Sequence, residues 1–318
     1  DGAEREMTSR KIGLPYRNAD GTMSRKDVVA YFTHRGPIVR STDGKWVSVR
    51  IMQEPVKALQ QSFLRTKQAD WNGYRKVMDL RTNSSNNTVY ADATGTIAFV
   101  NGDFIPKRDP KFDYTRPVDG TTSAVDWQGL HPLEETITVV NPANGWVMNT
   151  NNWPFTAAGP YSPSIAAFPK YMSQYQTENA RGIHATRVLS GRKGWTVDSV
   201  IKTAYDSYLP AFEGIVPPLL IAYDELPGAD TLRAKLAEPI AVMRAWDYRF
   251  GLESVGMTLG QFYGTEAARV RGEPSREHVL ALARVVDRLT RDFGSWKTPW
   301  GEVNRFQRLD GRIDAVYD

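Results

Sequence analysis

Residues 89–100 read VYADATGTIAFV, and this stretch decides the fold class. Two runs of β-branched, aromatic and small apolar residues flank a turn at residues 92–95 that ends in glycine, a pattern typical of a β-hairpin. Apolar side chains at helical spacing predict a helical excursion near residues 55–80. Further strands are predicted at residues 28–33, 46–50 and 136–140.

Beyond residue 190 the sequence predicts helices. Thr196 and Ser275 precede runs with helical periodicity and are expected to be N-caps. The first of these helices should end near Tyr208. The last should end near Gly294.

Prolines occur at several positions in the same half of the chain. Pro210, Pro217 and Pro218 are expected to interrupt any helix, and Pro239 to kink one that runs from about 230 to 250. The sequence therefore predicts an α+β protein. Residues 1–190 form its β-rich portion and residues 191–318 its mainly helical portion.

The composition excludes several classes of protein. There is no cysteine, which rules out disulfides, thiol catalysis and thiolate-bound zinc. The basic residues are scattered, so no nucleic-acid partner is expected. The longest apolar stretch, at residues 215–223, is too short to span a membrane. The four histidines lie far apart, and no phosphate-binding glycine loop or G-x-S-x-G motif occurs. No metal or cofactor is therefore expected.

Residues 141–154 read NPANGWVMNTNNWP, with five asparagines in the first twelve positions. Turn chemistry is one explanation, and it suits Asn144-Gly145 because asparagine tolerates a positive φ. It does not explain Asn149, Asn151 and Asn152, which follow an apolar run that suggests a buried strand. Amides at such a strand end need hydrogen-bond partners. A second explanation is that one of them is held as a neutral donor to a developing oxyanion.

The stretch from residue 87 to about 189 resembles the penicillin acylase family of N-terminal-nucleophile (Ntn) hydrolases. The matching motifs are the hairpin, VDWQGL at 125–130, the asparagine-rich segment, NAR at 179–181 and RVL at 187–189. Weaker similarity covers residues 33–39, 246–250 and 300–305. The resemblance implies an internal part of the catalytic β-subunit, built on the αββα sandwich of that family.

The resemblance also implies a mechanism and its residues. In the family, a serine at the β-subunit N-terminus attacks an amide, and its own amino group acts as base. An asparagine side chain and a backbone N–H form the oxyanion hole, and an arginine orients that asparagine. These roles fall on Asn151 and Arg181. The family's calcium ligand between these two positions has no counterpart, because residues 153–177 contain no acidic residue.

Nothing before residue 27 resembles the β-subunit N-terminus, so the nucleophile is expected outside this chain, which alone should be inactive. The expected partners are the α-subunit, the remaining β-subunit segments and a small acyl-amide substrate. That substrate would be an acyl-homoserine lactone, a lipopeptide or a β-lactam side chain. The family implies a periplasmic or secreted protein. Two alternatives stay open: a non-catalytic scaffold that keeps the acylase fold, and an unrelated β-rich carbohydrate-binding module.

Overall fold

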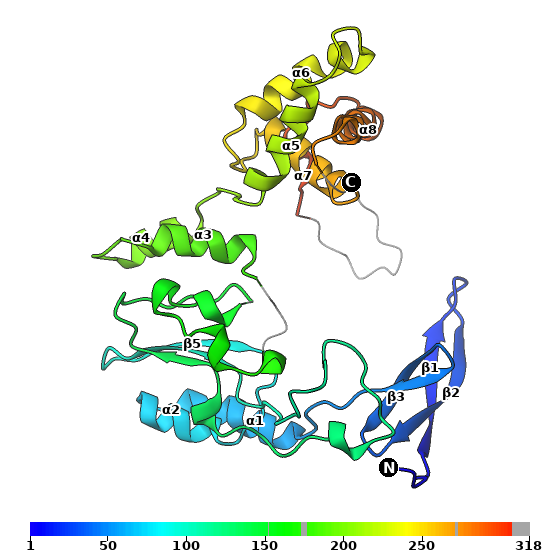
Figure 1. The fold of residues 1–318 in the computed structure, drawn as a ribbon, viewed down its shortest axis with the longest axis vertical. Coiled ribbons are helices and arrows are strands. Elements are labelled where there is room, and N and C mark those ends of the chain that lie inside the picture. The colour runs from blue at the N-terminus through cyan, green and yellow to red at the C-terminus, as the bar shows by residue number, and fades with distance from the viewer. Residues whose placement is uncertain (152, 173–176, 271–272, 307–318) are drawn as a thin grey trace. The chain divides into compact units, whose positions relative to one another are not determined.

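The chain divides into two compact units, residues 1–177 and 178–318 (Figure 1). The structure, a computed structural model, describes residues 1–151, 153–172, 177–270 and 273–306. Strands occur in the first unit and most helices in the second, so the predicted α+β class is confirmed. Among the described residues, no helix is long and apolar enough to cross a membrane.

The first sheet is a four-stranded antiparallel meander. Its strands are β1 (Thr8–Arg17), β2 (Met23–Thr33), β3 (Gly36–Thr42) and β4 (Lys45–Ser48), paired in that order. The predicted strands at 28–33 and 46–50 correspond to β2 and β4, whereas β1 was not predicted. Ile12 lies opposite Val28. Because side chains alternate along a strand, Leu14 and Tyr16 share the face of Ile12.

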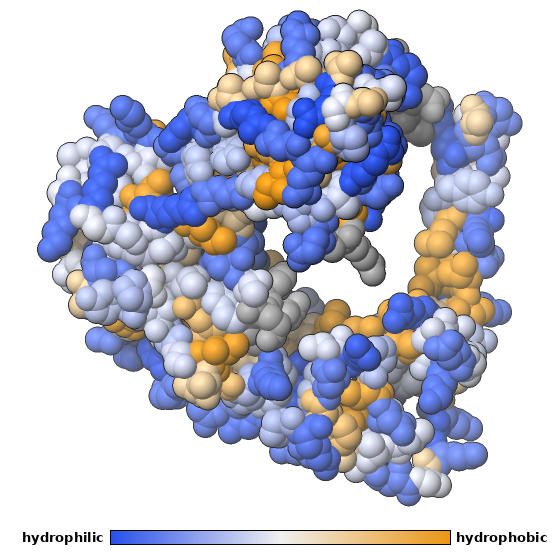
Figure 2. Space-filling model, turned by 45° about the horizontal axis from the view of Figure 1, so that its top comes forward, coloured by the Kyte–Doolittle hydropathy of each residue, from blue (hydrophilic) through white to orange (hydrophobic). Residues whose placement is uncertain are grey.

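This apolar face of the β1–β2 hairpin is largely open. Ile12, Leu14 and Tyr16 are 36%, 47% and 50% exposed. Figure 2 shows apolar side chains gathered along the hairpin. A two-stranded ribbon is marginal in water by itself, so this face is a surface that further packing would stabilise.

The second sheet contains the predicted hairpin. Its strands are β5 (Asn87–Ala91), β6 (Ile97–Asn101) and β7 (Thr138–Val140), with β6 in the centre. The predicted helical excursion is also confirmed, as α1 (Pro55–Leu64) and α2 (Trp71–Met78). Tyr74 and Met78 of α2 pack with Val100, while the neighbouring Phe99 packs with Ala157 and Ala158. Successive residues of β6 therefore contribute to two separate apolar clusters.

The second unit is helical. Its helices are α3 (Ala180–Leu189), α4 (Val197–Ala204), α5 (Phe212–Asp224), α6 (Thr231–Ala245), α7 (Val255–Ala267), α8 (Arg276–Phe293) and α9 (Trp300–Val303). Its core is formed by the buried faces of α5 to α8, with Leu219, Leu236, Leu259 and Leu282 fully buried. Thr196 caps α4 in a capping box, Ser275 precedes α8, and Gly294 ends α8 with φ 79°, as predicted.

One proline prediction and two helix ends were wrong. Pro217 and Pro218 lie inside α5 and do not break a helix. The helix α4 ends at Ala204, before the predicted Tyr208, and α6 ends at Ala245, before the predicted residue 250. Each proline removes one backbone hydrogen bond, which destabilises a helix. Burial of the neighbouring Val216 and Leu219 in the core offsets this cost. Local sequence rules do not include that tertiary contribution.

Candidate active site

The asparagine-rich segment is anchored on the second sheet. At the end of β7, the Asn141 side chain accepts a hydrogen bond from the backbone N–H of Ile97 at 2.9 Å. Gly145, with φ 77°, donates its N–H to the carbonyl of Pro142 at 2.9 Å. Asn144 donates its side-chain amide to the carbonyl of Ala158 at 2.9 Å. Turn chemistry therefore accounts for the first half of the motif.

The apolar run that follows is buried, but it is not a strand. Trp146 and Met148 are 9% and 8% exposed, and residues 146–149 have no strand pairing. Met148 is instead held by a single backbone hydrogen bond to the carbonyl of Ala157, at 2.8 Å. The predicted strand at 136–140 is likewise reduced to the three residues of β7. A loop that leaves the sheet therefore carries the remaining asparagines.

A chain of side-chain amides connects the hairpin to this loop. Asn101 on β6 donates to the Oδ1 of Asn87 on β5 at 2.8 Å. Asn87 in turn donates to the Oδ1 of Asn149 at 2.9 Å. That same oxygen accepts the backbone N–H of Asn151, also at 2.9 Å. The Asn149 side chain is thus the link that joins Asn151 to the sheet.

Asn151 has a left-handed backbone, with φ 62°. Non-glycine residues adopt this conformation uncommonly, although asparagine does so more readily than most others. The residue is exposed, and its backbone N–H is engaged by Asn149. Any donation to a substrate from Asn151 must therefore come from its side chain. The neighbouring Asn152 lies outside the described residues.

Asn87 and Asn101 were not predicted as site residues from the sequence. These two residues are cross-strand partners at the open end of the hairpin. The observed register pairs Ala91 with Ile97 and so places Asn87 opposite Asn101, whereas the turn predicted at 92–95 would have paired Asn87 with Val100. The sequence therefore did not indicate this pair. The loop asparagines are thus supported by a pair of sheet residues that local composition did not single out.

Arg181 is the second residue of α3, in the second unit, and it is exposed. Asn179 caps this helix, accepting the N–H of Gly182 at 3.0 Å. Asn151 belongs to the other unit, so the pairing of Asn151 with Arg181 stays a prediction.

Ion pairs hold α3 within the second unit. Arg187 forms a two-pronged contact with Glu213 at 2.6 and 2.8 Å. Hydrogen bonds from Arg187 and Tyr208 lower the pKa of Glu213 to about 2. His184 contacts Asp206 at 3.0 Å. These contacts fix the helix that presents Arg181.

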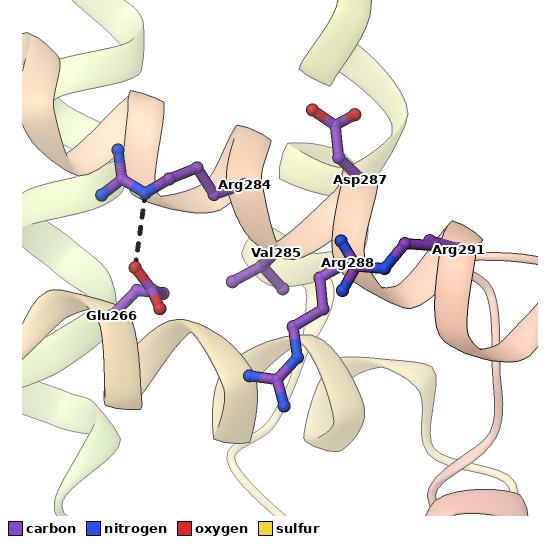
Figure 3. A pocket seen from close by; sticks show the side chains of 6 residues that line it. All are labelled: Glu266, Arg284, Val285, Asp287, Arg288 and Arg291. Carbon is purple, nitrogen blue, oxygen red and sulfur yellow. Dashed lines mark hydrogen bonds and ion pairs between the residues drawn. The ribbon is translucent and has the colours of Figure 1, made fainter.

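Neither of two hollows in the described parts of the chain is lined by Asn151 or Arg181. One is a cleft of about 880 Å³ in the first unit. The other, of about 330 Å³, lies between α7 and α8 (Figure 3). In this second hollow Arg284 pairs with Glu266 at 3.3 Å, and both Arg288 and Arg291 pair with Asp292. Each of its arginines therefore already has a carboxylate partner.

No group of three or more histidine, aspartate or glutamate side chains in the described residues is arranged to hold a metal ion. The described part of the loop after the asparagine motif, residues 153–172, supplies no carboxylate. Hard cations such as calcium prefer carboxylate and carbonyl oxygens. The lack of a calcium site in this loop remains a prediction for experiment.

The fold is that of a penicillin acylase. The structure of a thermostable penicillin G acylase from Alcaligenes faecalis matches with a TM-score of 0.59 and 19% sequence identity, over 92% of this chain and 62% of that chain. The family model described as penicillin amidase matches residues 1–311, so this chain belongs to the penicillin amidase family.

A curated relative, the penicillin G acylase of Escherichia coli, is 41% identical over 68 residues, which are 21% of this chain and 8% of that protein. The chain spans less than two thirds of the length of each of these two relatives.

Proposed function

We propose that this chain is part of an amidohydrolase that cleaves linear acyl amides, with Asn151 as oxyanion donor and Arg181 as the residue that positions it. The observation that carries the proposal is the amide chain from Asn101 through Asn87 and Asn149 to the backbone of Asn151. It supports a precisely held loop in a member of the penicillin amidase family. An oxyanion donor must be fixed in this way, because its contribution depends on pre-organisation.

In the proposed reaction, an N-terminal serine outside these residues attacks the amide carbon, and its amino group takes the hydroxyl proton. The carbonyl oxygen then becomes negative. The Asn151 side-chain N–H stabilises that charge without titrating, and it does not retain the carboxylate product as an ion pair would. Since the backbone N–H of Asn151 is engaged, the second donor comes from another residue. The planar guanidinium of Arg181 would donate to the carbonyl oxygen of the Asn151 side-chain amide and so hold its N–H group in position.

The proposed substrates are an acyl-homoserine lactone, a lipopeptide side chain or a β-lactam side chain. The proposed partners are an α-subunit and the remaining β-subunit segments, in the periplasm or outside the cell. The C–N bond then breaks, the amine leaves with the proton from the serine's amino group, and water hydrolyses the acyl-serine ester. No cofactor is needed, because the serine, its amino group, the oxyanion donors and water supply the whole reaction.

The test is Asn151→Ala in the assembled acylase that contains this chain, with hydrolysis measured on an N-acyl-homoserine lactone and on a penicillin. The kcat should fall by about 10²–10³, the usual effect of losing one oxyanion donor, with little change in KM. Asn72→Ala, on the exposed side of α2, is the control and should leave kcat unchanged. Undiminished turnover in Asn151→Ala would refute the role. A mature β-subunit that does not begin with serine would favour the non-catalytic scaffold.

A further inference from the structure

The 880 Å³ cleft lies at the base of the β1–β2 hairpin. Arg10, Phe32 and His34 line it from the first sheet, and Arg50 from the segment after β4. Phe104 and Trp127 line it from the loops around the second sheet. The cleft is therefore built from segments far apart in the sequence, all within the first unit.

Close backbone packing positions Arg50. Gly36 has φ 145°, and a Cβ at this position would lie 2.1 Å from the carbonyl oxygen of Val49. The N–H of Val49 donates to the carbonyl of Pro37 at 3.0 Å. The chain leaving β4 thus passes tightly against the start of β3, which places Arg50 on the wall of the cleft.

The opposite wall is also fixed. Gln128 donates its N–H to the carbonyl of Lys107, and Lys107 donates to the carbonyl of Gly129, both at 2.9 Å. The ring of Trp127 packs edge-on against Phe104, with centroids 5.7 Å apart. The guanidinium of Arg50 lies 4.4 Å from the Trp127 ring. Both an arginine and an aromatic surface are therefore presented in defined positions.

Two of the charged side chains that line the cleft already contact a group of opposite charge. Arg35 donates to Asp126 at 2.7 Å and to the carbonyls of Gly120 and Thr122. Glu54 has Lys57 as a partner at 3.9 Å. The pKa of His34 is lowered by burial and by the neighbouring Arg35 and Arg5, so its ring is neutral at pH 7.

Arg10 and Arg50 differ from these groups. In the described parts of the chain neither side chain makes a hydrogen bond or an ion pair. Their contacts are with aromatic rings, Arg10 at 5.8 Å from Phe32 and Arg50 at 4.4 Å from Trp127. The arginines of the hollow between α7 and α8 all have carboxylate partners. The cleft thus has two guanidinium groups without a direct carboxylate partner, although the charge of Arg50 also acts on Asp126.

We propose that this cleft binds an organic anion, whose carboxylate or phosphate group contacts Arg10 and Arg50 and whose apolar body packs on Phe32, Phe104 and Trp127. Guanidinium groups suit both anions, since their planar N–H pairs match two oxygens at once. Aromatic walls around a few polar groups are typical of small-molecule sites. The proposal does not depend on the catalytic role of Asn151, which does not line the cleft.

Calorimetric titration of the 318-residue chain tests this with four probes: 2-naphthoate, its neutral analogue 2-naphthalenemethanol, acetate and inorganic phosphate. Naphthoate should bind with one-to-one stoichiometry and at least tenfold more tightly than the alcohol. Arg10→Gln and Arg50→Gln should each weaken binding about fivefold, the scale of one solvent-accessible charge contact. Both side chains make no hydrogen bonds, so these variants should fold. Arg40→Gln is the matched control, because Arg40 is an exposed arginine of β3 outside the cleft.

Saturable phosphate binding that is lost in both cleft variants would assign a phosphate ligand. Binding of naphthoate without phosphate would assign a carboxylate. Either result supports the anion site, and affinity should fall as salt is added because the contacts are electrostatic. Equal binding of the neutral alcohol, equal weakening by Arg40→Gln, or no saturable binding of any probe would overturn the proposal.

Discussion

Asn149→Ala tests whether the amide chain holds the asparagine-rich loop. The Asn149 oxygen accepts two hydrogen bonds at 2.9 Å, from the Asn87 side chain and from the backbone of Asn151. Removing it deprives the partly buried Asn87 side chain and the exposed Asn151 N–H of this acceptor. Each such loss costs about 0.5–1.5 kcal/mol, so the free energy of unfolding of the first unit should fall by about 1–3 kcal/mol. Asn149→Asp keeps the Oδ1 acceptor that both donors share and should lose less.

Urea unfolding, followed by circular dichroism, measures this change. With a slope of about 2 kcal/mol per molar urea, the midpoint should shift by about 0.5–1.5 M. Because the two units can unfold separately, the transition of the first unit must be assigned by amide exchange of β5 and β6. Asn87→Ala combined with Asn149→Ala should cost less than the sum of the two single changes, since they share a bond. Additive effects, or an unchanged midpoint in Asn149→Ala, would refute the linkage.

Two other predictions concern pH and calcium. Burial raises the pKa of Asp103 to about 6, above the value of this group in the unfolded chain. The folded state therefore holds this proton more tightly than the unfolded state. The contribution of Asp103 to folding stability is fully present below about pH 4 and is lost as pH rises through 6. Between pH 4 and 7, the free energy of unfolding of the wild-type chain should fall by up to about 3 kcal/mol more than that of Asp103→Ala. A difference between the two proteins that stays constant over this pH range would contradict the prediction. Adding millimolar calcium or a chelator should leave the melting temperature unchanged, because residues 153–172 offer no carboxylate. Stabilisation by calcium that maps to this loop would contradict this prediction.

Signals confined to a few neighbouring residues predicted the fold best. The hairpin at 89–100, the start of α4 and the two ends of α8 depend on turn and cap residues, whose preferences act locally. β1 was missed because Gly13 and Pro15 interrupt its pattern. An edge strand tolerates proline, since one side of its backbone needs no sheet partner, but edge position is a property of the whole sheet.

The candidate site was predictable only in part. The high density of asparagine in the sequence indicated Asn149 and Asn151 as site residues. The hydrogen bonds of Asn87 and Asn101 depend on the strand register and on the path of the loop. The roles of Asn151 and Arg181 came from family resemblance and not from the residues themselves. No local rule connects an asparagine of one compact unit with an arginine of another.

The turn at Asn144-Gly145 has a consequence for the chemical ageing of the protein. Asparagine followed by glycine is the sequence most prone to deamidation, in which the glycine nitrogen attacks the side-chain amide and closes a succinimide ring. Here the Gly145 N–H is bound to Pro142, and the Asn144 amide is bound to Ala158. The folded turn holds both reacting groups in other contacts. Deamidation at this site should therefore report on opening of the loop during storage.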